Sequence, residues 1–181
     1  DVVFNNSVQN NSTNFVDNFD SNELHLNWNF RRYPIEDVYK ISKEENRLNL
    51  LCHPNQIKER GRAALLGFKQ TESDFEYLTQ MYFDPNSSDS EAGISLFQKD
   101  DNYINFTLIK QLGKYFLQAY VVKKGEILTS VKQELKQYQG NIKFKVIAEK
   151  DLYKLYYSIE GMQFNLFTTL DGSLLKSNGY T

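Results

Sequence analysis

The sequence predicts an all-β protein in which two antiparallel sheets pack face to face. From Asn22 onward, short stretches rich in aromatic and β-branched residues alternate apolar and polar positions with period two. Turn signals separate these stretches at roughly the 8–12-residue spacing of all-β domains, and no long stretch combines helical spacing with caps at both ends. About a dozen such stretches in one chain, with only 3 Pro and 9 Gly, favour a large sandwich over a small barrel.

Residues 75–83 form the clearest expected strand, because every second side chain is apolar or β-branched while Glu76 and Gln80 share the other face. Residues 141–149 repeat this alternation, which places Phe144 and Val146 inward and Lys145 outward. Residues 130–138 are the best helical candidate, yet their pattern fits a strand equally well. The other expected strands are residues 23–30, 37–41, 46–52, 62–68, 93–98, 103–109, 114–122, 126–131, 152–159 and 162–170.

The amino end differs in composition from the rest of the chain. Residues 1–16 are rich in Asn and Ser and show little periodicity, as expected of a linker or a tail from a preceding domain. Residues 17–181 are expected to form the sandwich. A domain of this size buries roughly 70% of its unfolded surface, so it needs no disulfide to be stable.

Charge and hydropathy exclude several classes of partner. The formal net charge is −2 and Lys and Arg occur singly or in pairs, so there is no basic stripe for nucleic acid or an anionic membrane. No apolar run approaches the roughly 18 residues of a membrane helix, and no signal segment is expected at the amino end. We therefore expect no nucleic-acid partner and no membrane partner. The single Cys52 leaves the compartment, cytoplasmic or exported, open.

One stretch, FDPNSSDSEAGISLF at residues 83–97, is dense in Asp and Ser and then turns apolar. A helix–loop–helix calcium loop needs Gly at its position 6 and Glu at its position 12. Counted from Asp84, those positions hold Asp89 and Ser95, so the template fails at both. A catalytic carboxylate cluster is a second alternative. The pattern favours a polar hairpin loop at residues 84–90, with the next strand beginning at Glu91.

The sequence predicts no catalytic residue, no metal site and no cofactor. Cys52 and His53 are adjacent, and adjacent strand side chains point to opposite faces, so they are poorly placed as nucleophile and base. Cys52 is instead expected to be a buried structural residue. His25 lies on a different expected strand, which leaves no zinc-ligand spacing. Glycoside hydrolysis needs only two acids a fixed distance apart, and spacing along the sequence selects no pair among 23 acidic residues.

Three stretches, residues 17–32, 62–106 and 178–181, together resemble a known family. The first contains the phrase D-x-F-x-x-x-x-L-x-x-x-W, matched by Asp17, Phe19, Leu24 and Trp28. The second follows the acceptor-rich loop with Glu-Ala-Gly at residues 91–93, and the third is NGYT. These stretches resemble the carboxy-terminal concanavalin A-like β-sandwich of glycoside hydrolase family 43, which contains β-xylosidases and α-arabinofuranosidases.

The resemblance implies a concanavalin A-like, jelly-roll antiparallel β-sandwich that lacks its last strands, because the family continues past the Gly-aromatic-Thr phrase. It also implies an accessory domain of a glycoside hydrolase active in xylan degradation. The chemistry would then lie on an amino-terminal catalytic propeller of the same polypeptide, on which this domain packs. The further partner implied is a xylo- or arabino-oligosaccharide.

Tyr180 of NGYT matches an aromatic that, in the family, borders the sugar-binding site at the mouth of the catalytic pocket. Tyr180 is therefore expected to be a substrate-binding residue that helps to close this pocket. The alternative function is a carbohydrate-binding module, in which Tyr and Trp on a concave sheet face stack on sugar rings. The sequence does not tell which of Tyr153, Tyr156 and Tyr157 is exposed.

Overall fold

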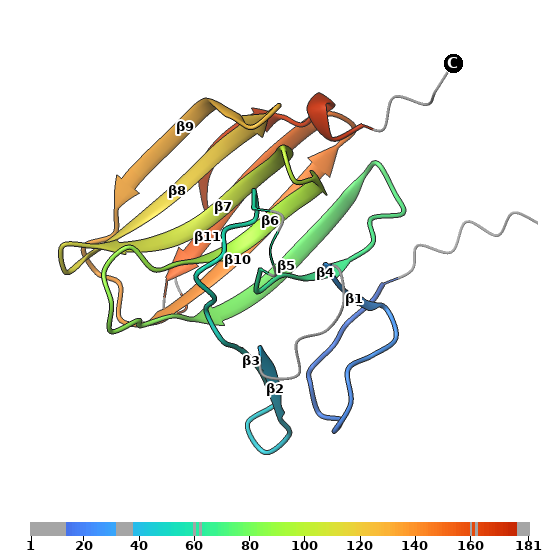
Figure 1. The fold of residues 1–181 in the computed structure, drawn as a ribbon, viewed down its shortest axis with the longest axis vertical. Coiled ribbons are helices and arrows are strands. Elements are labelled where there is room, and N and C mark those ends of the chain that lie inside the picture. The colour runs from blue at the N-terminus through green and yellow to red at the C-terminus, as the bar shows by residue number, and fades with distance from the viewer. Residues whose placement is uncertain are drawn as a thin grey trace, which may run out of the picture.

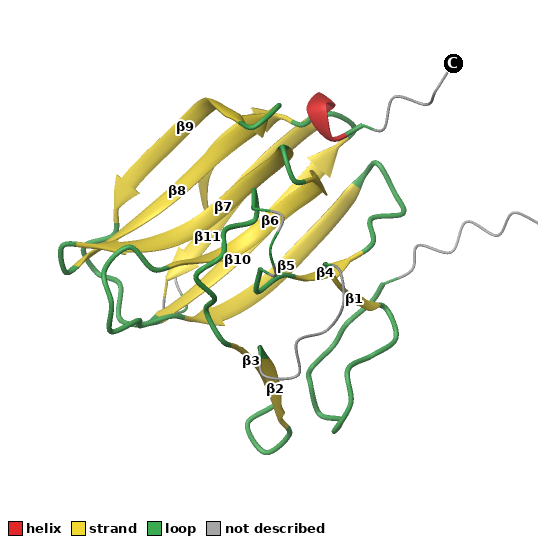
Figure 2. Cartoon of the chain, viewed as in Figure 1, coloured by secondary structure: helices red, strands yellow, loops and turns green. Residues whose placement is uncertain are grey.

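The computed structural model describes residues 14–31, 38–59, 61, 63–159, 161 and 163–176. Strands dominate these residues, which confirms the all-β prediction, and one short 3-10 helix, η1 (Ser173–Leu175), follows the last strand. Two four-stranded antiparallel sheets form the body of the molecule (Figure 1), and loops connect them (Figure 2). No described segment forms a helix long and apolar enough to cross a membrane.

The first sheet is a meander of consecutive strands, because two-residue turns set its register. Both residues of the turns Leu112–Gly113 and Lys124–Gly125 have positive φ, between 49° and 82°. Turns of this kind match the twist of the flanking strands, and glycine adopts positive φ without strain. The strands lie in the order β6 (Glu91–Lys99), β7 (Asn102–Gln111), β8 (Lys114–Lys123) and β9 (Glu126–Glu134).

The second sheet combines a meander with one earlier strand. Its order is β12 (Asn165–Asp171), β11 (Leu152–Ile159), β10 (Asn141–Glu149) and β5 (Phe75–Tyr82), all antiparallel. Burial alternates along β10 as the sequence predicts: Phe144 and Val146 are fully buried, whereas Lys145 points to the opposite face. The same alternation holds along β5.

The core lies between the two sheets. Phe106 of β7 and Phe144 of β10 meet edge to face, with ring centroids 4.9 Å apart. Phe167 of β12 also stacks on Phe106, with centroids 5.6 Å apart. The fully buried side chains around them come from β7, β8, β10 and β11 and are Ile104, Leu108, Leu117, Ile142, Val146 and Leu155.

Four short strands lie outside the two sheets. They form two antiparallel pairs, β1 (Trp28–Phe30) with β4 (Leu66–Phe68), and β2 (Tyr39–Ser42) with β3 (Arg47–Leu50). The Asp17 carboxylate accepts hydrogen bonds from the Trp28 indole Nε1 at 2.7 Å and from the Phe19 backbone N–H at 2.8 Å. The Phe19 ring stacks on Trp28. These contacts give a structural reason for the D-x-F…W phrase.

Two elements depart from the sequence pattern. Residues 130–138 are not helical: β9 pairs with β8 as far as Glu134, and Leu135 and Tyr138 then turn into the core. Strand β7 is buried on both faces, because Tyr103, Asn105 and Thr107 are each about 5% exposed although they point away from the inter-sheet core. A further layer therefore covers the outer face of the first sheet.

Candidate functional site

The covering layer is the segment between β3 and β4, and Arg31 holds it in place. The Arg31 guanidinium donates to the backbone carbonyls of Ile57 and Glu59 and forms an ion pair with Asp100 at 2.6 Å. It also lies 5.4 Å from the centroid of the Phe97 ring. Because its side chain is only 7% exposed, this bridge fixes the segment across the carboxyl end of β6. In Figure 1 the segment crosses in front of β6 and β7 and leaves β9 uncovered.

Cys52 lies at the start of this segment. It is exposed, so the prediction of a buried structural cysteine is wrong. The physical reason is that β3 ends at Leu50, and the chain beyond it has left the pairing with β2. His53 is exposed as well, and its Nδ1 accepts a hydrogen bond from the Asn55 backbone N–H at 3.1 Å.

The acidic loop at residues 84–90 is a crossover between the sheets, so the prediction of a hairpin loop is wrong. Strand β5, before it, pairs with β10 in the second sheet, whereas β6, after it, pairs with β7 in the first. Alternation along the chain indicates that two strands exist, but it does not indicate which strands pair. Strand β6 does begin at Glu91, as predicted.

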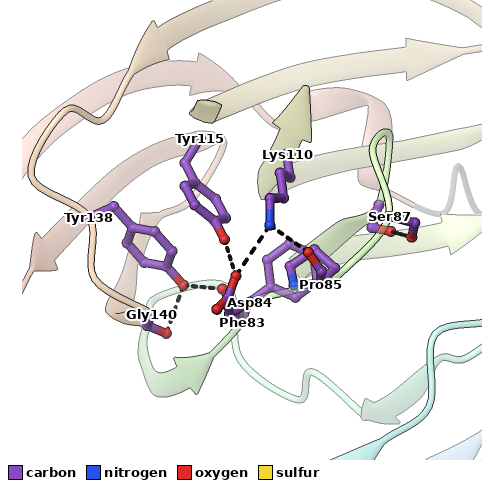
Figure 3. A network of polar contacts seen from close by, with 9 residues as sticks. Phe83, Asp84, Pro85, Ser87, Lys110, Tyr115, Tyr138 and Gly140 are labelled. Atoms are coloured by element: carbon purple, nitrogen blue, oxygen red, sulfur yellow. Dashed lines mark hydrogen bonds and ion pairs between the residues drawn. The ribbon is translucent and has the colours of Figure 1, made fainter. Parts of the chain in front are cut away.

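A network of polar contacts ties the first half of this loop to the end of the first sheet (Figure 3). The Asp84 carboxylate accepts hydrogen bonds from the Tyr115 hydroxyl and, at 3.3 Å, from the Lys110 ammonium. The same ammonium donates to the Pro85 carbonyl at 2.7 Å. The bond from Tyr115, followed by that from Lys110, holds the pKa of Asp84 below its ordinary value. Asp84 is therefore a structural anion that fastens the crossover to β7 and β8.

Tyr138 extends this network to the start of β10. Its hydroxyl lies 2.7 Å from the carbonyl oxygens of both Phe83 and Gly140, and its ring packs against Tyr115 with centroids 4.6 Å apart. Burial raises the pKa of the Tyr138 hydroxyl, so it stays protonated as a donor at neutral pH. The crossover is thus anchored to both sheets.

The second half of the loop satisfies the end of β7. The Asp89 N–H donates to the Lys110 carbonyl at 2.7 Å, and the Asp89 carboxylate accepts from Gln111 Nε2 at 3.2 Å. The Ser88 hydroxyl accepts from the Leu112 N–H at 3.3 Å. The acceptor-rich composition of the loop therefore serves protein donors, which is the ordinary role of Asp and Ser in turns.

Directly after the loop, Glu91 organises a second polar network on the outer face of the first sheet. Its Oε1 accepts hydrogen bonds from the Thr107 hydroxyl at 2.6 Å and the Tyr120 hydroxyl at 3.0 Å. The Tyr120 hydroxyl in turn accepts from Asn105 Nδ2 at 2.7 Å. Burial, reinforced by the charge of Glu91, raises the pKa values of Tyr120 and Tyr103, so both phenols remain neutral.

Gly93 allows this network to form. A Cβ placed on Gly93 would lie 2.4 Å from the Phe106 carbonyl oxygen and 2.7 Å from the Thr107 Cα. Only a residue without a side chain permits this close approach of β6 and β7.

A hollow of about 430 Å³ opens beside the Glu91 network on the outer face of the first sheet. Gln56 and Lys58, from the covering segment, border it on one side, and Ser130 and Lys132 of β9 border it on the other. The residues of β6, β7 and β8 that line it are Glu91, Tyr103, Gln118, Tyr120 and Val122. This hollow is larger than a second hollow, of about 50 Å³, beside Gln80 and Gly161. The local sequence pattern does not predict the larger hollow, because its walls come from segments far apart in the chain.

Two of the three tyrosines on β11 of the second sheet are used for packing and do not form an exposed aromatic surface. Tyr153 is buried in the core, and Tyr157 packs against the core with its ring edge to face with Phe167. Tyr156 is half-buried, and the Lys145 ammonium lies 5.2 Å from its ring centroid. Two of the three tyrosines that the sequence left open are therefore committed to packing.

The remaining residue singled out by the sequence, Tyr180, lies outside the described residues. The described chain ends at Lys176. Lys176 is tied to the body of the sandwich: its ammonium pairs with Asp151 at 2.8 Å, and its carbonyl accepts from Gln98 Nε2 at 2.9 Å.

Fold and site together define the class of this protein. It is an antiparallel β-sandwich domain with a hydrogen-bonded crossover between the sheets at residues 84–90 and a polar hollow on one outer face. The family model for the β-xylosidase C-terminal concanavalin A-like domain matches residues 16–180. The chain belongs to this family, which is the family of the carboxy-terminal domain of glycoside hydrolase family 43 xylosidases, and the predicted concanavalin A-like sandwich is confirmed.

Individual relatives agree with this assignment. A xylosidase/arabinosidase of Butyrivibrio fibrisolvens is 28% identical over 90 residues, which are 50% of this chain and 17% of the relative. Two solved structures share the fold. A family 43 protein of Bacillus licheniformis has a TM-score of 0.79 at 22% identity over 88% of this chain. A xylan β-1,4-xylosidase of Bacillus halodurans has a TM-score of 0.80 at 20% identity over 90% of this chain. The chain spans only 31% and 32% of these two proteins.

Proposed function

We propose that this chain is the accessory domain of a family 43 glycosidase, that it packs on a catalytic propeller preceding it in the polypeptide, and that it helps to close the sugar pocket there. The observation that carries the proposal is the family match over residues 16–180, in a chain about a third as long as its structural relatives. The substrates would be xylosides or arabinosides, the class in the name of the Butyrivibrio relative.

The anchored carboxyl end supports a specific place for the catalytic domain. Lys176 is fixed by Asp151 and Gln98, and Leu174 and Leu175 pack against the core just before it. Tyr180 follows four residues later, and an extended chain spans at most about 3.6 Å per residue, or roughly 14 Å in all. The pocket that Tyr180 closes would therefore lie within that distance of the η1 end of the sandwich.

Kinetics of the complete protein test this role. Tyr180→Ala should lower kcat/KM on an aryl xyloside about threefold to tenfold, as expected from losing an aromatic contact of roughly 0.5–1.5 kcal/mol. Tyr180→Phe should retain most of the activity, and both variants should melt at the parental temperature. Parental kinetics for Tyr180→Ala on both a xyloside and an arabinoside would make the domain a structural buttress without a role in the pocket.

The alternative function, a carbohydrate-binding module, has one observation in its favour: the hollow beside Glu91. It does not compete with the accessory role, because the hollow and the η1 end of the sandwich are formed by different residues.

A further inference from the structure

We propose that the hollow on the outer face of the first sheet binds an uncharged oligosaccharide, at a site of its own and independently of the pocket that Tyr180 serves. Its volume of about 430 Å³ lies within the range typical of small-ligand sites, roughly 300–1,000 Å³. Apolar surface and fixed hydrogen-bonding groups meet in it, and a sugar ring presents this same combination on its C–H faces and hydroxyl edges.

The polar groups of the hollow are held in place before any ligand arrives. Both hydrogen bonds that described residues make to the Glu91 carboxylate fall on Oε1, from Thr107 and Tyr120. The carboxylate is thereby oriented while its Oε2 keeps its accepting capacity. Gln118 donates its Nε2 to the Thr107 hydroxyl at 3.4 Å, which directs its amide along the same face. Groups fixed in this way lose little conformational entropy on binding.

Asn105 is a buried polar residue whose amide makes only part of its possible hydrogen bonds. It is 5% exposed, and it donates Nδ2 to the Tyr120 hydroxyl, while its own Oδ1 has no partner among the described residues. Ser95, directly opposite Asn105 in the register, also has a buried hydroxyl without a partner there. Unsatisfied buried polar groups cost stability and call for an explanation. Because Asn105 donates to the Tyr120 hydroxyl oxygen, the Tyr120 proton is left to point toward Glu91. The Asn105 amide thus orients two groups that line the hollow.

The charges and the apolar lining favour an uncharged ligand. The Glu91 carboxylate would repel an anion. Two lysines, Lys58 and Lys132, border the hollow together with Glu91, so its lining carries both signs of charge. The Lys132 ammonium is already engaged, because it donates to Gln111 Oε1 and lies 4.8 Å from the Phe116 ring centroid. Ile127 lines the opposite part of the hollow and is 64% exposed, an apolar surface suited to the C–H face of a sugar ring.

Titration of the full 181-residue chain with xylohexaose tests the site, with cellohexaose and an arabino-oligosaccharide as comparison probes. Ser130→Tyr is the blocking variant, since Ser130 is exposed and lines the hollow, and its side chain makes no hydrogen bond to another described residue that the change would remove. Thr129→Tyr is the matched control, because it adds the same side chain to the opposite face of β9. We expect xylohexaose to bind, Ser130→Tyr to weaken binding at least about tenfold, and Thr129→Tyr to leave the Kd unchanged.

Glu91→Gln provides a second variant that keeps the shape and the acceptor Oε1. It should weaken binding several-fold, because a hydroxyl donates more strongly to a charged oxygen than to a neutral one. Thermal melts of all variants show whether each has folded. No binding of any of the three oligosaccharides at millimolar concentration overturns the proposal, and so does binding that both tyrosine variants leave intact. Neither outcome affects the Tyr180 proposal, which is read from kinetics.

Discussion

Phe106 and Phe144 meet edge to face between the two sheets, with their ring planes 83° apart and both side chains fully buried. Each ring comes from an inner strand of its own sheet, Phe106 from β7 and Phe144 from β10. This contact joins the two layers, as does the stacking of Phe167 of β12 on Phe106.

Removing one of these rings should be costly. Phe144→Ala should lower the free energy of unfolding by roughly 3–5 kcal/mol, since it leaves a cavity where two rings meet. Lys145→Ala, on the opposite face, should cost only about 0.5–1 kcal/mol, the value of an exposed cation–aromatic contact, because its ammonium lies 4.4 Å from the Phe164 ring centroid. Urea denaturation measures both. Equal losses would contradict the assignment of faces along β10.

The contact between Asp17 and Trp28 should be visible by fluorescence, because Trp28 is the single Trp of the chain. Asp17→Ala removes the acceptor of the indole N–H and that of the Phe19 N–H. We expect it to cost about 1.5–3 kcal/mol, the range for hydrogen bonds to a charged group, and to shift the Trp28 emission. Asp17→Asn, which keeps one acceptor oxygen, should lie between the parent and the alanine variant. An unchanged spectrum in Asp17→Ala would remove this explanation of the D-x-F…W phrase.

The hydrogen bonds that Tyr115 and Lys110 donate to Asp84 predict that the free energy of unfolding depends on pH. The folded protein lowers the pKa of this carboxyl, so its contribution to stability is present above the unfolded-state pKa and is lost as the pH falls through the folded-state pKa. Chemical denaturation at pH 7 and at steps below pH 4 should show this loss. It should be smaller in Asp84→Asn, which has no charge to lose, and in Tyr115→Phe, which lacks the main donor. If the free energy of unfolding fell with pH to the same extent in parent and variants, the Asp84 contacts would contribute nothing to stability.

Calcium should not stabilise the acidic loop. Asp84, Asp89 and Glu91 each hold protein donors, and among the described residues no group of three or more His, Cys, Asp or Glu side chains is placed to share a metal ion. A metal that binds only the folded state would raise the melting temperature. Melting curves with calcium and with a chelator should therefore coincide, and a rise of several degrees with calcium would restore the metal-loop alternative.

The chain by itself should not hydrolyse aryl xylosides or arabinosides. The carboxylates with the most defined surroundings, Asp84 and Glu91, are each committed to donors of the fold, and the proposed function places the chemistry in another domain. Assays of purified chain with both substrates check this expectation. Turnover that persists through further purification and is abolished by a substitution in this chain would contradict it.

The sequence could predict the strands because burial leaves a local signal. Along β10 and β5 the alternation of side chains has the same period as the pleat, and one face meets the core. Strand β7 shows no such alternation, since its outer face is covered as well and Asn105 and Thr107 are buried there. Nothing close in sequence indicates this covering.

The candidate site depends even more on distant residues. Glu91 and Tyr120 are 29 positions apart, and they meet only because β7 lies between their strands. The predicted hairpin at residues 84–90 is wrong for the same reason: β5 pairs with β10, a partner that a local pattern does not name. Gly93 is the exception, because a glycine between apolar residues is itself a local sign of close backbones.

Because β7 is buried on both faces, the strands of this domain should differ in how readily they open locally. Strand β7 has a paired strand at each edge and is buried on both faces, so we expect its amides to exchange with solvent mainly when the whole domain unfolds. Strand β9 has one free edge and mostly exposed side chains, so it opens on its own at much lower cost. The hollow spans this difference: Glu91 on one side is hydrogen-bonded to Thr107 of β7, whereas Ser130 on its rim belongs to β9.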